Sequence, residues 1–188
     1  MIWEVGGFVG DVHDAFLPEG TTSNPSNVFG DGSGGADTAE VRLRRVAVGI
    51  VVVENDIEIV GHITGPLSGL KQPVPRGELK ALWLTATEFR GYAIFATDCE
   101  NVYKGWRAQI YLTPNGKDSD LRAMICQFVE GKSVDLIQAA FINSHFGAED
   151  LCDGQVQGWM ILGSTVIDEL VGTKATETRV SAEVRHRA

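Results

Sequence analysis

The sequence has few cysteines, no long apolar run and no basic start. Its three cysteines, Cys99, Cys126 and Cys152, lie far apart, which argues against a disulfide framework or a zinc knuckle and favours a reducing compartment. No stretch approaches the roughly 18–20 apolar residues of a membrane span. Residues 1–10 lack the basic segment that opens a secretion signal. These absences predict an intracellular protein, cytoplasmic or nuclear, with no membrane partner.

Positive charge is also scarce. The chain has 16 Lys and Arg against 25 Asp and Glu, a net charge of −9. This balance argues against a protein that depends on non-specific phosphate binding, because such proteins need a basic face. A local basic strip can still bind nucleic acid, and a metal site accounts for several carboxylates. The one basic cluster, residues 42–45 (RLRR), is either a solvated strand edge or a grip on phosphates.

The 188 residues are enough for one domain with a substantial core. Residues 1–25 are interpreted as an N-terminal arm or linker, because they show no sustained periodicity and residues 18–27 are polar and turn-rich. Residues 26–175 are expected to form the domain, and residues 176–188 a polar C-terminal tail. The apolar residues near the start either dock on the domain or belong to a larger polyprotein.

Within the expected domain, segments with the apolar pattern of β-strands alternate with segments whose apolar residues recur at the spacing of an α-helix. They predict strands at residues 28–30, 46–53, 57–63, 92–96 and 134–142, and helices at residues 75–90, 119–130 and 162–175, with a short helical piece ending at residue 104. The first three strands follow one another through short links and predict an antiparallel meander. The strand–helix–strand–helix order of the second half predicts strands added in parallel. The fold class is therefore α/β.

Four acidic residues stand out by their place relative to these elements: Asp31, Glu78, Asp98 and Asp168. Asp31 and Asp98 each close a strand, so they project from adjacent strand ends if these strands are neighbours. Glu78, in the first turn of its helix, and Asp168 are both expected to point toward the sheet. Converging carboxylates repel one another unless a cation lies among them, and Mg²⁺ prefers oxygen ligands. Two such ions can activate a water and stabilise the leaving oxygen of a phosphodiester.

Each of these acids also fits a common structural role. Asp31 followed by Gly32 is, taken alone, more often a turn, and Glu78 also complements a helix dipole. Asp98 also suits a helix N-cap, and an exposed helical aspartate such as Asp168 is usually only solvated. None of these roles excludes a metal. A phosphate-binding loop at residues 30–34 (GDGSG) is rejected, because no Lys-Ser/Thr pair and no helix follows.

Five stretches, in this order, resemble the motifs of the ribonuclease H family, in the form found in retrotransposon polyproteins. They are residues 28–34 (VFGDGSG), 75–82 (PRGELKAL), 96–105 (ATDCENVYKG), 143–145 (NSH) and 163–170 (GSTVIDEL). Residues 118–121 (DSDL) are similar to the start of a further family helix. The sequence departs from the family at Gly30, where threonine is common, at Gly77, where alanine is usual, and at Ser164, where asparagine is usual.

The resemblance implies a five-stranded mixed sheet with helices on both faces, made of a three-stranded antiparallel meander and two parallel strands. It implies Mg²⁺- or Mn²⁺-dependent cleavage of the RNA strand of RNA–DNA hybrids by two metal ions. Asp31, Glu78, Asp98 and Asp168 would hold the ions, and His145 would help to move a proton or release product. The other implied partner is the rest of a reverse-transcriptase polyprotein.

Substrate contacts are expected from residues near these acids. The candidates are Gly32, Ser33, Arg76, Asn101, Lys104, Arg107, Lys117 and Arg122. Asn101 lies three residues past Asp98, where it could face the minor groove and the 2′-hydroxyls of the RNA strand. Two alternatives stay open: a catalytically inactive ribonuclease H-like binding or connection module of a retroelement polyprotein, or another nuclease on the same fold.

Overall fold

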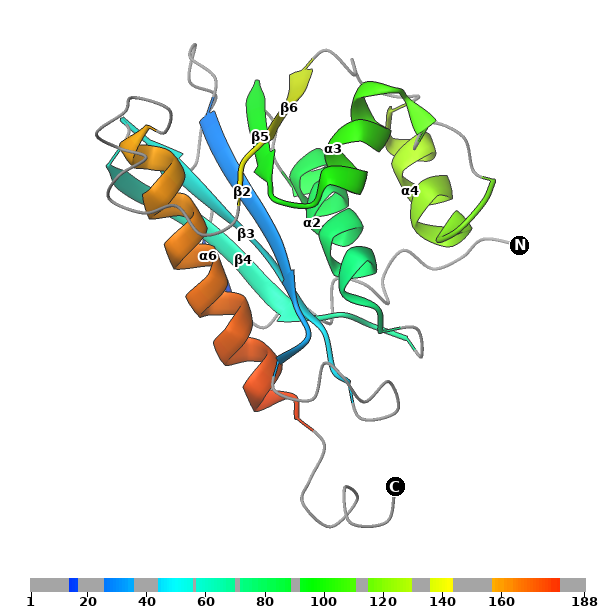
Figure 1. Cartoon of the computed structure of the whole chain (residues 1–188), viewed down its shortest axis with the longest axis horizontal. Coiled ribbons are helices and arrows are strands. Elements are labelled where there is room, and N and C mark those ends of the chain that lie inside the picture. The colour runs from blue at the N-terminus through cyan, green and yellow to red at the C-terminus, as the bar shows by residue number, and fades with distance from the viewer. Residues whose placement is uncertain are drawn as a thin grey trace.

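The computed structural model describes residues 14–16, 26–35, 44–55, 57–69, 72–88, 92–110, 115–129, 136–143 and 157–179. These residues form a mixed sheet with helices on both faces (Figure 1). The strands are β1 (Asp14–Phe16), β2 (Ser26–Ser33), β3 (Ala47–Glu54), β4 (Glu58–Pro66), β5 (Ala93–Thr97) and β6 (Ile137–Phe141). The helices are α2 (Val74–Glu88), α3 (Glu100–Arg107), α4 (Ser119–Val129) and α6 (Gly158–Glu177).

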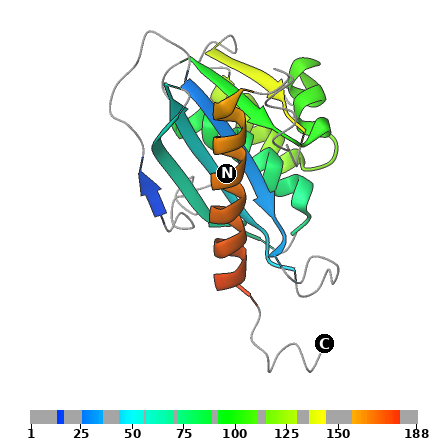
Figure 2. The ribbon, with the colours of Figure 1, turned by 60° about the vertical axis from the view of Figure 1, so that its left-hand side comes forward.

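The sheet confirms the predicted topology and adds one strand to it. Its order is β1-β4-β3-β2-β5-β6, in which β2, β3 and β4 form the antiparallel meander and β5 and β6 are added in parallel. The expectation of five strands was incomplete, because β1 pairs antiparallel with the outer edge of β4 (Figure 2). This strand lies within the residues interpreted as an arm. At three residues, it is too short to show a hydrophobic period.

Two helix starts differ from the prediction. α2 begins at Val74, so Glu78 lies in the second turn of the helix and not the first. α6 begins at Gly158, four residues before the predicted start at residue 162. Its first turn is fixed by Trp159, which is buried with its ring edge against Phe29 at a centroid distance of 5.3 Å. Among the described helices, none is long and apolar enough to span a membrane.

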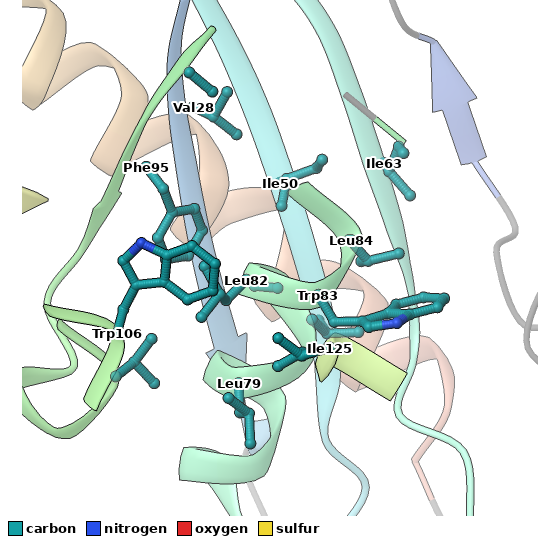
Figure 3. Close-up of a cluster of buried hydrophobic side chains, with 14 of the residues drawn as sticks. Val28, Ile50, Ile63, Leu79, Leu82, Trp83, Leu84, Phe95, Trp106 and Ile125 are labelled. Carbon is teal, nitrogen blue, oxygen red and sulfur yellow. The ribbon is translucent and has the colours of Figure 1, made fainter. Parts of the chain in front are cut away.

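The sheet has a hydrophobic core on each face. On one face, α2, α3 and α4 cover side chains that include Val28, Ile50 and Phe95 (Figure 3). Helix α6 lies on the other face (Figure 1). It covers a second cluster that includes Phe29 and Val51. Successive residues of a strand therefore belong to different cores, and β3 is buried along almost its whole length. This double coverage explains why β3 is a nearly continuous β-branched run.

Helix α2 approaches β2 through two facing glycines. A Cβ atom on Gly32 would lie 2.9 Å from backbone atoms of Gly77 and Glu78, and a Cβ on Gly77 would lie 2.8 Å from Val46 and 3.1 Å from the Cα of Gly32. In the same way, a Cβ on Gly30 would overlap the ring of Phe95. Two of the glycines at which the sequence departs from the family motifs are therefore required by close packing. Backbone contact at Gly77 offsets its helix propensity cost of roughly 1 kcal/mol.

We expect Gly32→Ala to destabilise the fold by about 1–3 kcal/mol, because the added methyl meets helix backbone that cannot rotate away. Gly172→Ala in α6 is the matched control. A Cβ there has nothing within 4 Å, so the same substitution should stabilise the protein by about 0.5–1 kcal/mol. Urea unfolding of both variants gives the two free energies. Equal effects of the two substitutions would contradict the close contact between α2 and β2.

Candidate metal centre

Three of the four predicted acids meet at one edge of the sheet. Asp31 lies near the end of β2, Asp98 follows β5 directly, and Glu78 comes from α2. The parallel pairing of β2 and β5 sets Phe29 opposite Ala96, and the same register continued for two residues brings Asp31 opposite Asp98. One carboxylate oxygen of each acid lies within 4.8 Å of the others. This acidic cluster matches the convergence that the strand-end positions predict.

Glu78 is held in place by two hydrogen bonds. Its Oε1 accepts from the backbone N–H of Gly32 at 3.0 Å, and its Oε2 accepts from the hydroxyl of Thr97 at 3.4 Å. The Thr97 hydroxyl in turn accepts from the N–H of Cys99 at 3.1 Å, which fixes the turn that carries Asp98. Sequence reasoning missed Thr97, although a hydroxyl directly before a strand-end aspartate is the local signal for such a role.

The three acids of the cluster differ in their exposure to solvent. Glu78 is 4% exposed, Asp31 is half-buried and Asp98 is exposed, so solvent reaches the cluster from the side of Asp98. Burial raises the pKa of Glu78 well above its usual range, and the nearby charges of Asp31 and Asp98 raise it further. A cation among the three groups would favour their ionised forms and so offset both effects. The all-oxygen donor set suits a hard divalent ion such as Mg²⁺ or Mn²⁺.

Asp168 is placed differently from the expectation that it faces inward. It is exposed on α6, and among the described residues the acids close enough to share an ion are the three above, without Asp168. The helix turns Ile167 and Val171 to the sheet instead, where both pack around Gly49. Since Gly49 pairs with Asp31, this turn of α6 lies level with the acidic cluster. A ligand role for Asp168 stays a prediction.

Some predicted residues lie outside the described part of the chain. His145 is one, and the first half of the basic cluster at residues 42–45 is another. Arg44 is half-buried and Arg45 exposed, just before β3 begins. The roles predicted for His145 and for this basic cluster stay predictions.

Several candidate substrate contacts gather in a pocket beside the acidic cluster. The cavity has a volume of about 310 Å³, and its polar lining includes Asn101, Lys104, Lys117 and Arg122. Cys99, the neighbour of Asp98, also lines it, so the pocket adjoins the acidic cluster. Lys104 forms an exposed ion pair with Glu100 at 2.6 Å. The sequence named these residues separately, and the packing of α2, α3 and α4 brings them together.

Three other candidate substrate contacts form hydrogen bonds within the fold: Gly32, Ser33 and Arg76. The N–H of Gly32 is donated to Glu78, and the hydroxyl of Ser33 accepts from Gly35 at 3.3 Å. Arg76 is buried, and its guanidinium donates to Asp118 at 3.0 Å and to both carboxylate oxygens of Asp120. Arg76 therefore ties α2 to the start of α4 and does not present its charge to an open surface. Its partners are too distant in sequence for a local pattern to reveal the pair.

The Arg76–Asp120 pair predicts that the stability of the fold depends on pH in the acid range. Hydrogen bonds from Arg76 lower the pKa of Asp120 from its ordinary value of 3.8 to about 2. The pair therefore stabilises the fold above about pH 4, and this contribution is lost as the pH falls toward 2. Asp120→Asn should flatten the fall in unfolding temperature over that range. At neutral pH we expect a loss of about 1 kcal/mol or less, because the Asp120 side chain is 59% exposed.

Thermal melts from pH 2 to 7 measure this effect. An Arg76→Met background is the control, because Asp120→Asn should change little once the guanidinium is gone. An undiminished effect in that background would show that another group holds the pKa of Asp120 down.

Comparison with solved structures identifies the fold. The RNase H domain of PFV is similar with a TM-score of 0.58 at 14% identity, over 81% of this chain and 94% of that one. LC11-RNase H1, isolated from compost and solved in complex with an RNA/DNA hybrid, is similar at 0.56 and 11% identity, over 81% and 97%. The Prototype Foamy Virus protease-reverse transcriptase is similar at 0.57 and 14%, over 87% of this chain and 22% of that one.

These similarities show that the chain has the ribonuclease H-like fold. The predicted mixed sheet with helices on both faces is thereby confirmed. No family model and no curated protein sequence matches the chain. At such low identities, the shared feature is the fold, and its activity has to be argued from the site.

Proposed function

We propose that this chain is a metal-dependent endonuclease that hydrolyses the RNA strand of RNA–DNA hybrids. One observation carries the proposal: Asp31, Glu78 and Asp98 converge within 4.8 Å on a ribonuclease H-like fold. Burying a glutamate beside two other acids costs free energy, and an apolar side chain could fill the same space without that cost. A merely structural role therefore does not account for Glu78. The same arrangement is favourable if its purpose is to hold cations.

The acidic cluster would hold Mg²⁺ or Mn²⁺, two ions in the arrangement that the fold implies, with Asp168 as a fourth ligand from α6. When bound, such ions supply an activated water and stabilise the oxygen that leaves phosphorus. Glu78 is fixed by Gly32 and Thr97, so it gives the site a rigid inner wall. Asp98 is exposed and lies on the side from which a phosphodiester can approach. His145 would assist proton transfer or product release.

The pocket beside the acidic cluster suits one strand of a nucleic acid. Its lining has three cationic side chains, Lys104, Lys117 and Arg122, and one carboxylate, that of Asp118, which is paired with Arg76. Positive charge therefore predominates there and offers contacts to phosphates, in a chain whose overall charge is −9. Asn101, which lines the pocket three residues after Asp98, would address the 2′-hydroxyls of the RNA strand in the minor groove. The LC11-RNase H1 structure holds an RNA/DNA hybrid, which supports this class of substrate. The foamy virus protein supports a setting beside a reverse transcriptase.

The direct test is to incubate the purified protein with an end-labelled RNA–DNA hybrid in Mg²⁺, in Mn²⁺ and in EDTA. We expect cleavage of the RNA strand alone, dependent on metal and abolished by EDTA. Duplex DNA and single-stranded RNA serve as the competing substrates. Cutting of either of these in preference to the hybrid would assign another nuclease activity on the same fold.

A second candidate function is an inactive binding or connection module in a polyprotein. The exposed position of Asp168, outside the three-acid group, favours it. This alternative predicts that the protein binds the hybrid without cutting it in either metal. Cleavage of the hybrid rejects it.

A further inference from the structure

An aromatic pair is exposed at the outer edge of the sheet. Tyr103 of α3 lies against Phe141 of β6, with ring centroids 5.7 Å apart and planes inclined by 39°. Phe141 is 41% exposed and Tyr103 is half-buried. A large aromatic side chain at the end of an edge strand leaves apolar surface open to solvent, where a flat apolar group can contact it.

A cation completes this aromatic pair. Arg107, one turn after Tyr103 on α3, places its guanidinium 5.6 Å from the centroid of the Tyr103 ring and donates to the Tyr103 hydroxyl at 2.9 Å. Arg107 itself is exposed. The three side chains thus present two ring surfaces and a positive charge together. We call this set, Tyr103, Arg107 and Phe141, the edge patch.

The edge patch is continuous with the acidic cluster. Phe141 pairs with Thr97 in the parallel register of β5 and β6, and Thr97 directly precedes Asp98. The N–H of Ile142 extends this pairing by donating to the carbonyl of Thr97 at 3.1 Å. On the other side, α3 begins two residues after Asp98. A nucleic-acid strand whose phosphate is held at Asp98 therefore needs to cross only one neighbouring β-strand to reach the edge patch.

We propose that the edge patch is a stacking platform for an unpaired nucleobase, carried by a single-stranded extension of the RNA–DNA hybrid. This inference rests on the proposed function, because it assigns a place to the substrate next to the cleavage site. Nucleobases stack on aromatic rings and on guanidinium planes, whichever base they are. Arg107 adds attraction for the adjoining phosphates.

The charge of the patch distinguishes a nucleic acid from the other occupant, a second copy of this chain. The net charge of −9 opposes a second copy and a nucleic acid alike, so the local positive charge of Arg107 decides between them. A symmetric contact between two copies would bring two Arg107 side chains together, and these repel each other. An extension of nucleic acid brings phosphates to Arg107 and bases to the rings. Base stacking fits the exposure of Phe141, since a base needs one free ring face.

The test uses fluorescence anisotropy in EDTA with three labelled probes: a blunt hybrid, the same hybrid with a four-nucleotide RNA extension, and one with an abasic extension of equal length and charge. We expect about tenfold tighter binding of the extended probe than of the blunt and abasic probes, the effect of one stacked base. Phe141→Ala should abolish this preference, and Phe141→Trp should retain it. Ile57→Ala is the control, because Ile57 is 81% exposed in the hairpin between β3 and β4.

Each result decides the proposal. Equal affinity for the base-bearing and abasic extensions in the unaltered protein overturns the platform without any variant being made. A change of oligomeric mass in Phe141→Ala, with the tenfold preference intact, assigns the patch to a contact between copies and also overturns it. Tighter binding of the extended probe by a protein that never cleaves would support the platform and reject the endonuclease. Binding of no probe would reject the platform, and the cleavage assay in Mg²⁺ and Mn²⁺ would then decide the endonuclease by itself.

Discussion

Asp98→Asn is expected to lower RNA-strand cleavage by about 10³-fold or more while leaving the fold intact. Asp98 is the exposed member of the acidic cluster, and its oxygen lies within 4.8 Å of those of Asp31 and Glu78. Asparagine keeps the size of the side chain but removes the charge that attracts a cation. Metal ions contribute several kcal/mol of charge stabilisation in such reactions, and about 4 kcal/mol corresponds to roughly 10³-fold in rate.

The matched control for Asp98→Asn is Glu88→Gln. Glu88 is exposed at the last position of α2, roughly 15 Å along the helix from Glu78, and its substitution removes the same unit of negative charge. Cleavage rates and circular dichroism of both variants separate loss of chemistry from loss of fold. If Asp98→Asn cleaves at the parental rate, the acidic cluster is not the active site.

The sheet and the acidic cluster could be predicted because their signals are local. Residues 46–53 form a β-branched run that marks a strand covered on both faces, and β3 occupies residues 47–54. Asp31 lies near the end of β2 and Asp98 directly follows β5, its parallel neighbour, and the carboxyl ends of such strands meet at one edge. The convergence of these two acids therefore followed once the order of the strands was correct.

The orientation of Asp168 could not be predicted from spacing alone. At roughly 100° per residue, Asp168 lies about 60° beyond Val171 and about 100° from Ile167, at the margin of the face that these two residues define, so the rotation of the helix decides whether it is covered. The rotation is set by contacts made elsewhere, above all by Gly163, where a Cβ would lie 2.1 Å from the ring of Phe29. The glycine lets α6 settle on β2 in one orientation, which turns Asp168 to solvent.

Arg76 and Gly77 also depend on tertiary contacts. In the sequence, Arg76 is a candidate contact to substrate, and Gly77 is a departure from the family motif. In the fold, Arg76 is enclosed by Asp118 and Asp120, and Gly77 lies against Gly32. Both contacts join segments that are more than forty residues apart. No pattern within a single helix contains that information.

Glu78→Gln is expected to stabilise the metal-free protein and to abolish its stabilisation by Mn²⁺ or Mg²⁺. Burial and the charges of Asp31 and Asp98 disfavour an ionised Glu78, and they raise its pKa. Glutamine fills the same space and can still accept the N–H of Gly32, so the variant loses the electrostatic penalty without opening a cavity. The same change removes the buried charge on which an ion depends.

The size of the metal effect can be calculated from mass action. At a metal concentration of about 100 times Kd, the unaltered protein should gain about 2.7 kcal/mol, which raises the unfolding temperature of a domain of this size by roughly 5–10 °C. Glu78→Gln should show almost none of this shift, and Glu88→Gln should show all of it. Thermal melts with and without Mn²⁺ measure both effects without relying on activity. Glu78 is the most deeply buried acid of the cluster, so an ion bound there should depend on its charge. A Glu78→Gln variant that keeps the full shift would therefore mean that the ions bind elsewhere.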